Sequence, residues 1–430
     1  MIGFAIAFLG SLALANYWIG RRFLYPPVVF CSVWAADLTL VWLAGDFFYP
    51  LADETLAIFC LGGMAFSVGA SIALLVPQKT VVEQPLGKAS DRSLSLALLI
   101  VACFSPFILI WIVKLASEFQ TASWLLSARM AMLEADQSGD RAPVLFGNIV
   151  TLSIIVAMVA FLQKETGRKR SLLAIVLALL LNVAGGGRAG IVVLLLSLLC
   201  IDWIRNDCLR WKPLAIALSA VVIISGAMAI AVQKGEARAD VPLAENLTPV
   251  FQGLVSYTAG GIVAFDRVVR EPSIVVHNWQ ASRFFLQVAA KLGAHVDVPS
   301  QHADYVTIGP GGLSQNVYTM YFAYFDLGLI AMLLLVVLDA SIVTLFYRRA
   351  VAGSRVSIIL YSFFFASMLL TPFSEMWLLG LNFSLKIFLL AWLVYRFPGR
   401  LHQACDFLAR RNPLPAWHQT SWSHVKAGEQ

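Results

Sequence analysis

Long apolar stretches separated by short polar connections dominate this chain. Each stretch approaches the roughly 20 residues that an α-helix needs to cross the hydrocarbon of a bilayer. The pattern predicts an all-α, polytopic membrane helix bundle with eleven spans. Their expected ranges are 2–20, 28–45, 55–76, 94–116, 143–163, 171–184, 189–204, 213–233, 317–347, 356–371 and 376–396.

The positions of Lys and Arg predict the orientation of these spans. Alternate connections are basic, as at Arg21-Arg22, 168–170 and Arg348-Arg349, whereas the intervening ones are acidic or poor in cations, as at 46–54. Cationic loops stay in the cytoplasm, so we expect an external N-terminus and a cytoplasmic C-terminus. The net charge of +6 then reflects membrane topology and does not indicate a nucleic-acid partner.

This topology divides the chain into four expected parts. An N-terminal bundle of eight spans (1–233) precedes a large external loop (234–315), a C-terminal bundle of three spans (316–396) and a cytoplasmic tail (397–430). Hydrophobic residues form 59% of the chain and charged residues 13%, which excludes an ordinary soluble globular protein. None of the six cysteines falls in an expected external connection, so no disulfide framework is predicted. CxxC and HExxH spacings do not occur, so neither a dedicated zinc site nor another cofactor is expected.

The external loop 234–315 is too long to be a simple connection. Apolar residues recur at helical spacing over 247–269 and 279–292, and prolines separate these pieces. We therefore expect two or three helices of this loop to lie over the outer mouth of the bundle.

A glycine-rich interruption at 185–187 is followed by Arg188, with no acidic residue beside it. Only 17 uncharged residues separate Arg188 from Arg170, and only 13 separate it from Asp202. Helices this short do not span about 30 Å, so Arg188 is expected below the outer surface, at the floor of a depression. A guanidinium at a helix N-terminus forms an anion site. The alternative is a tight turn whose arginine reaches lipid headgroups.

Three stretches give the chain a resemblance to a known family. They are GGGRAGIVVLLLSLL (185–199), YTAGGIVAFDRVV (257–269) and NVYTMYFAYFDLGLIAMLL (316–334). In their order and spacing they resemble the O-antigen polymerases, the Wzy-type oligosaccharide repeat-unit polymerases of bacterial inner membranes. The resemblance covers roughly residues 90–395.

The resemblance implies a metal-independent glycosyltransferase that joins lipid-linked repeat units on the periplasmic face of the inner membrane. The growing chain would pass from undecaprenyl diphosphate to a new lipid-linked unit, with release of the lipid diphosphate. The implied partners are undecaprenyl-diphosphate-linked oligosaccharides, membrane lipid and, in addition, a chain-length regulator.

Residues suited to this chemistry can be proposed on their own merits. Arg188 and Arg283 are expected to stabilise the departing diphosphate, and His302 to act as the general base. Each loop arginine could alternatively be a charge that faces lipid headgroups, and His302 could be an ordinary surface side chain. For Arg267 and Arg270, the alternative is local ion pairing with Asp266 and Glu271. Asp304, which is near His302 in the sequence, could act instead, and Asp266 and Glu375 are weaker candidates for the base. The expected substrate-binding residues are Arg238, Tyr257, Arg270, Asn316, Tyr318, Thr319, Tyr324 and Asp326.

Three alternatives stay open from the sequence. The tyrosines at 318, 321 and 324 could instead form an aromatic belt at the outer interface. An O-antigen ligase would use the same donor but transfer the chain to lipid A core. A polysaccharide transporter or flippase would be expected to show paired halves with broken helices at corresponding positions.

Overall fold

The computed structural model describes residues 1–77, 91–119, 121, 124, 126–128, 130–131, 144–163, 167–184, 188–231, 243–272, 280–299, 305–316, 319–378 and 380–395. Within these residues the N-terminal part forms eight helices. They are α1 (Ile2–Gly20), α2 (Pro26–Ala44), α3 (Asp53–Leu75), α4 (Asp91–Ser117), α6 (Val144–Leu162), α7 (Arg168–Ala184), α8 (Arg188–Asn206) and α9 (Trp211–Ala231).

The C-terminal part contains both helices and a short hairpin. Its helices are α10 (Leu243–Arg270), α11 (Arg283–Lys291), α12 (Met320–Phe325), α13 (Leu329–Val351), α14 (Arg355–Leu369) and an apolar helix over Leu381–Tyr395. The strands β1 (Tyr305–Thr307) and β2 (Ser314–Asn316) pair antiparallel, with Val306 opposite Gln315. Short 3-10 turns occur at η1 (Gly45–Phe47), η4 (Gln280–Ser282) and η5 (Pro310–Gly312).

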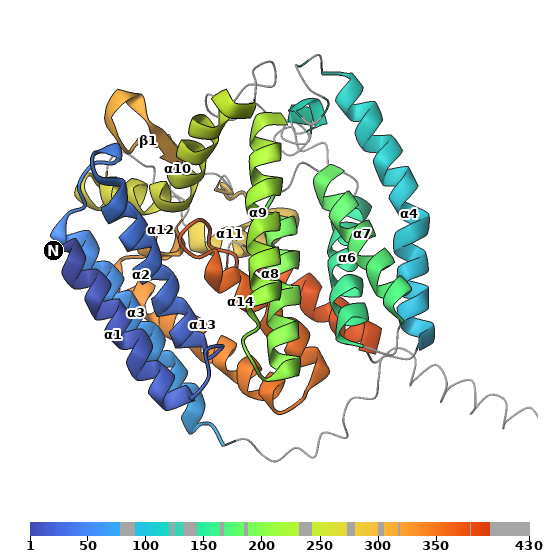
Figure 1. The fold of residues 1–430 in the computed structure, drawn as a ribbon, viewed down its shortest axis with the longest axis horizontal. Coiled ribbons are helices and arrows are strands. Elements are labelled where there is room, and N and C mark those ends of the chain that lie inside the picture. The colour runs from blue at the N-terminus through green and yellow to red at the C-terminus, as the bar shows by residue number, and fades with distance from the viewer. Residues whose placement is uncertain are drawn as a thin grey trace, which may run out of the picture.

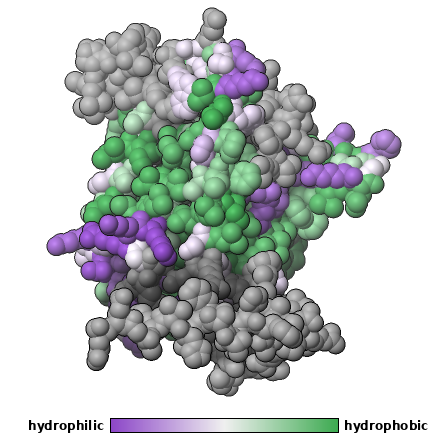
Figure 2. Space-filling view, turned by 90° about the vertical axis from the view of Figure 1, so that its right-hand side faces the viewer, coloured by the Kyte–Doolittle hydropathy of each residue, from purple (hydrophilic) through white to green (hydrophobic). Residues whose placement is uncertain are grey.

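The helices identify the chain as a helical, multi-pass membrane protein. Six of the described helices are long and apolar enough to cross a bilayer, and four shorter ones are also apolar. Hydrophobic residues cover much of the middle of the face shown in Figure 2, and hydrophilic residues lie near its top, at its left below the middle and along the projection on the right. This distribution is the one that a bilayer around the middle of the molecule requires.

The longer helices form three neighbouring groups (Figure 1). Helices α1, α2, α3 and α13 pack together on one side, α4, α6 and α7 on the other, and α8, α9 and α14 lie between them. Helix α3 approaches α13 most closely at Gly69, where an added Cβ would overlap the carbonyl oxygen of Val337. Small residues allow such close packing of helices where lipid offers no hydrophobic driving force.

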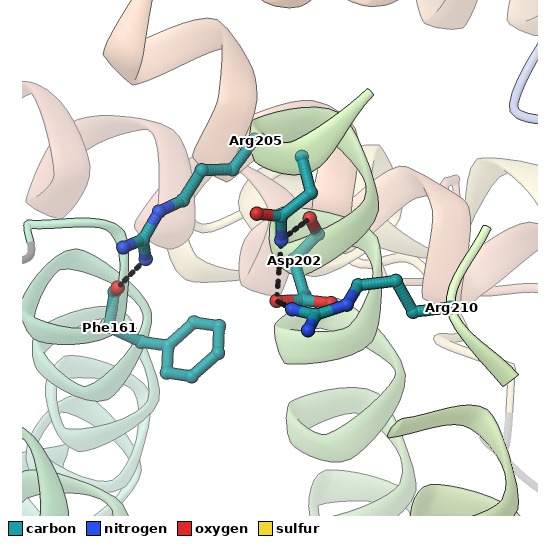
Figure 3. Close-up of polar contacts among 5 residues, drawn as sticks. Phe161, Asp202, Arg205 and Arg210 are labelled. Carbon is teal, nitrogen blue, oxygen red and sulfur yellow. Dashed lines mark hydrogen bonds and ion pairs between the residues drawn. The ribbon is translucent and has the colours of Figure 1, made fainter. Parts of the chain in front are cut away.

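The basic connections meet at one end of the bundle. Arg22 pairs with Asp207 at 2.8 Å, which joins the connection after α1 to the one after α8. Arg205, near the end of α8, donates to the carbonyl oxygen of Phe161 at 3.0 Å, and Arg210 lies 3.7 Å from Asp202 (Figure 3). These contacts bring the end of α6 and the connections after α1 and α8 together at one end of the bundle.

The connection between α2 and α3 lies at the opposite end, one full length of α2 away. The amide of Tyr49 donates to the carbonyl oxygen of Ile308 at 2.9 Å, and the amide of Ala52 donates to Asp266 at 2.7 Å. This end therefore holds α10 and the β-hairpin (Figure 1). The connection between α2 and α3 is thus at the end opposite to the one after α1, and the predicted orientation in the membrane stays a prediction.

The segment predicted as an external loop differs from the expectation in two ways. Helices over 243–270 and 283–291 agree with the predicted helical pieces, but the second half of α10 is buried within the fold and does not lie over it. The hairpin was not expected in an all-α fold, and the proposed boundary between 315 and 316 falls inside β2. Its turn contains Gly309-Pro310-Gly311-Gly312, with Gly312 at φ +79°, which is turn chemistry that hydropathy does not register.

The predicted ninth span, 317–347, is wrong as one continuous helix. Helix α12 ends at Phe325, and α13 begins at Leu329 after Gly328, whose φ is +89°. A positive φ is easily adopted by glycine and interrupts the helix, although the residues on both sides are apolar. Helix α13, with 23 residues, is itself long enough to span. Residues 319–328 therefore pack with α10 and η4 and are separate from the span α13.

Candidate functional site

Helices α10 and α12 pack directly against each other through aromatic side chains. The ring of Phe265 on α10 lies 6.4 Å from that of Tyr321 and 5.7 Å from that of Phe325, measured between centroids. Tyr321 also packs against Trp34 at 4.5 Å and Phe59 at 5.6 Å. Two of the three stretches that carry the family resemblance, 257–269 and 316–334, thus form one packed unit on α2 and α3.

The segment 370–378, which follows α14, is the third component of this unit. The amide of Met320 donates to the carbonyl oxygen of Thr371 at 2.9 Å. Tyr257 stacks on Phe373 with a centroid distance of 6.1 Å and an interplanar angle of 19°. An added Cβ at Gly261 would meet the carbonyl oxygen of Pro372 at 2.8 Å, so glycine permits α10 to lie against this segment. We name α10, the β-hairpin, α12 and residues 370–378 the covering unit.

Several predicted substrate-binding residues come together in the covering unit. Tyr257 is 38% exposed, so one edge of its stacked ring is accessible. Asn316 ends β2 and is buried, and Thr319 is buried as the N-cap of α12, where its hydroxyl accepts from the amide of Phe322 at 3.2 Å. The cap explains why α12 begins at Met320. These three residues are therefore held by a rigid frame of backbone and side-chain contacts.

A buried polar cluster connects α12 to α13 and to residues 370–378. The hydroxyl of Tyr324 contacts the carboxylate of Asp339 on α13 and lies 3.1 Å from that of Glu375. Glu375 also accepts from the backbone amides of Trp377 and, at 2.9 Å, Leu378. All three side chains are buried, with exposed fractions of 0% for Tyr324, 6% for Asp339 and 3% for Glu375. Tyr324 is closed to solvent here, so its contacts suit a role in holding the unit together.

The burial of Tyr321 and Tyr324 excludes these two residues from an interfacial aromatic belt. Both side chains are fully enclosed, whereas belt residues place one end at the headgroup level. Tyr318, the third residue of that pattern, lies outside the described residues.

The arginines at the end of α10 form local ion pairs. Arg270 lies 2.7 Å from the fully buried carboxylate of Asp266 and also donates to the carbonyl oxygen of Pro50. Arg267 lies 3.8 Å from Glu271. These contacts are the local pairing that the sequence offered as an alternative to phosphate binding. Asp266 ties α10 to the connection between α2 and α3.

Arg283 and Asp326 make contacts at the two ends of the short segment around α11. Arg283 is the first residue of α11, and its Nε donates to the carbonyl oxygen of Pro299 at 3.0 Å. Asp326 ends α12, and its carboxylate accepts from the amide of Gln280 at 2.9 Å. Asp326 therefore joins η4, which precedes α11, to the start of α13.

Arg188 is the first residue of α8, as expected of a residue that follows a glycine-rich break. Close packing of α7 on α8 supports this position, because an added Cβ at Gly190 would overlap the side-chain oxygen of Asn182. The side chain of Arg188 lies outside what the structure describes, and so do residues 185–187. Arg238, His302 and Asp304 are likewise outside the described residues.

The sequence analysis did not identify the contacts of Asp339 and Gln280. Asp339 was detectable as a carboxylate inside an apolar stretch, which is costly unless it has a partner. Its partners are distant in sequence, so no local pattern indicated them. Among the described residues, no group of three or more His, Cys, Asp or Glu side chains is placed to hold a metal ion.

No protein-family model, curated protein or solved structure matches this chain.

Proposed function

We propose that this protein polymerises undecaprenyl-diphosphate-linked oligosaccharide repeat units at the periplasmic face of the bacterial inner membrane. The product is an O-antigen or a related surface polysaccharide. One observation carries the proposal: the covering unit packs on a multi-pass bundle and holds the ring of Tyr257, which is 38% exposed, by stacking it on Phe373. Asn316 and Thr319 are buried in the same unit and support its frame. A partly exposed aromatic ring that is held in place by stacking suits the recognition of a sugar.

In the proposed reaction, a hydroxyl oxygen of the incoming unit attacks the anomeric carbon of the growing chain. The bond between that carbon and the diphosphate oxygen breaks, and undecaprenyl diphosphate leaves. The hydroxyl proton passes to a general base, for which His302 is our candidate. Charge develops on the departing diphosphate, so it needs oriented donors.

Arg188 is the proposed donor to that diphosphate. It opens α8, so its guanidinium and the free amides of the first helical turn would act on the same anion. Arg238 and Arg283 are proposed as further cations for the donor or the acceptor. The ion pair with Asp266 assigns Arg270 a mainly structural part in this scheme.

Deletion of the gene, followed by gel analysis of surface polysaccharide, tests the proposal. We expect caps that carry a single repeat unit, with full-length polymer restored by the wild-type gene. Loss of all attached glycan would instead indicate a ligase, and accumulation of lipid-linked units on the cytoplasmic side would indicate a flippase. Either result would overturn the proposal.

A further inference from the structure

Helix α11 exposes the apolar side of its surface. The exposed fraction is 59% for Phe285, 41% for Val288 and 83% for Leu292, which directly follows the helix. These residues stand at i, i+3 and i+7, so they form one stripe. Gln287, on the other side, is only partly exposed. A surface helix in water has the reverse arrangement, with its apolar stripe on the core and its polar side outwards.

A hydrogen bond links the segment before α11 to the start of a spanning helix. The amide of Gln280, three residues before α11, donates to the carboxylate of Asp326 at 2.9 Å. Asp326 lies three residues before Leu329, the first residue of the span α13. Helix α11 therefore begins at the level where α13 enters the bilayer.

The surface of α13 at this level is also apolar and exposed. Ile330 is 77% exposed and Leu334 is 64% exposed, as expected of side chains that face lipid. The exposed stripe on α11 and the exposed apolar start of α13 thus belong to segments that the bond between Gln280 and Asp326 joins. Lys291 is exposed beside the stripe, and its long side chain can extend an ammonium to lipid phosphates while its methylenes stay on apolar surface.

We propose that α11 is an interfacial helix that lies in the outer surface of the bilayer, with Phe285, Val288 and Leu292 facing the lipid acyl chains. An amphipathic helix in this position buries its apolar face about 5–10 Å below the headgroups. The link to the exposed apolar start of the span α13, together with the exposed Lys291, favours lipid over a protein partner. This inference concerns how the segment sits on the membrane and does not rest on the proposed enzymatic activity.

Depth-dependent quenching on the full chain in phospholipid nanodiscs tests this proposal. Para-azidophenylalanine is introduced singly at 285, 288, 292 or 287 and coupled to a small fluorophore. We expect a nitroxide on acyl carbon 5 to quench the first three positions at least about twofold more strongly than position 287. Aqueous iodide should give the reverse order. All four sites are exposed or partly exposed, and each labelled protein is first required to melt like the wild type.

Two results would overturn the proposal. Strong quenching by iodide at 285, 288 and 292, without quenching by the lipid nitroxide, would show that the stripe faces water. Protection from both quenchers would show that protein covers the stripe, either a second copy or another part of the chain. If one labelled position fails to fold, the remaining two positions of the stripe give the same comparison with position 287.

Discussion

Removal of the Tyr324 hydroxyl tests whether the buried polar cluster stabilises the covering unit. In Tyr324→Phe the carboxylates of Asp339 and Glu375 lose their shared donor, while the shape of the ring is kept. A hydrogen bond contributes about 0.5–1.5 kcal/mol net, and a buried partner left unpaired adds a penalty of about 1–3 kcal/mol. We therefore expect the free energy of unfolding to fall by on the order of 2 kcal/mol.

Tyr321 provides a matched control on the same helix. It is as fully buried as Tyr324, but its hydroxyl has no hydrogen-bond partner within the described part of the chain. Tyr321→Phe therefore removes an unsatisfied polar group and should leave stability unchanged or raise it. The two variants differ from the wild type by the same single oxygen atom, so their difference isolates the hydrogen bonds.

Thermal unfolding of the purified protein in one detergent measures this difference. A loss of about 2 kcal/mol corresponds to a fall in the melting temperature of roughly 2 °C or more for a chain of this size. The double variant with Asp339→Asn should show non-additive losses, because the two residues act through one contact. Equal melting temperatures for Tyr324→Phe and Tyr321→Phe would refute the argument.

Three further predictions address packing, chemistry and topology. Gly69→Ala should destabilise the protein by about 1–3 kcal/mol, because its Cβ would overlap a backbone oxygen of α13. Gly147→Ala, which has open space around it, should not destabilise the protein. Equal melting temperatures for the two variants would contradict this prediction. Arg188→Ala should reduce polymer yield roughly 100-fold in well-expressed protein, and Arg188→Lys should rescue poorly because it lacks the bidentate fork; full-length polymer from the alanine variant eliminates the role. A reporter fused near Gly293 should show periplasmic activity, and cytoplasmic activity there would reverse the topology.

The helices that could be predicted from the sequence are those with a continuous run of apolar residues and polar residues at both ends. The expected spans 2–20 and 55–76 correspond to α1 and α3 within two residues, because their ends coincide with changes in polarity. The break between α12 and α13 was missed because Gly328 and Asp326 are too few to alter the average hydropathy of their neighbours. The hairpin was missed because its strands have three residues each and are held mainly by contacts with each other and with α10.

The site could be predicted only in part, since its contacts connect distant residues. The sequence identified Tyr257, Asn316 and Thr319 by residue type, but their common frame depends on residues 370–378, which gave no local signal. The pairing of Arg270 with Asp266 was detectable, because a spacing of four residues places both on one helix face. The contacts of Asp339 could not be predicted, because Tyr324 and Glu375 approach it only when α12, α13 and residues 370–378 pack together.

Reconstitution with defined substrate tests the central claim most directly. The purified protein is placed in phospholipid vesicles with a single undecaprenyl-diphosphate-linked repeat unit, in excess chelator, and the products are separated by length. We predict a ladder of multiples of the repeat unit, together with one undecaprenyl diphosphate released for each bond formed. Unchanged substrate from protein that retains its wild-type melting temperature, with or without added magnesium or manganese, would contradict the account.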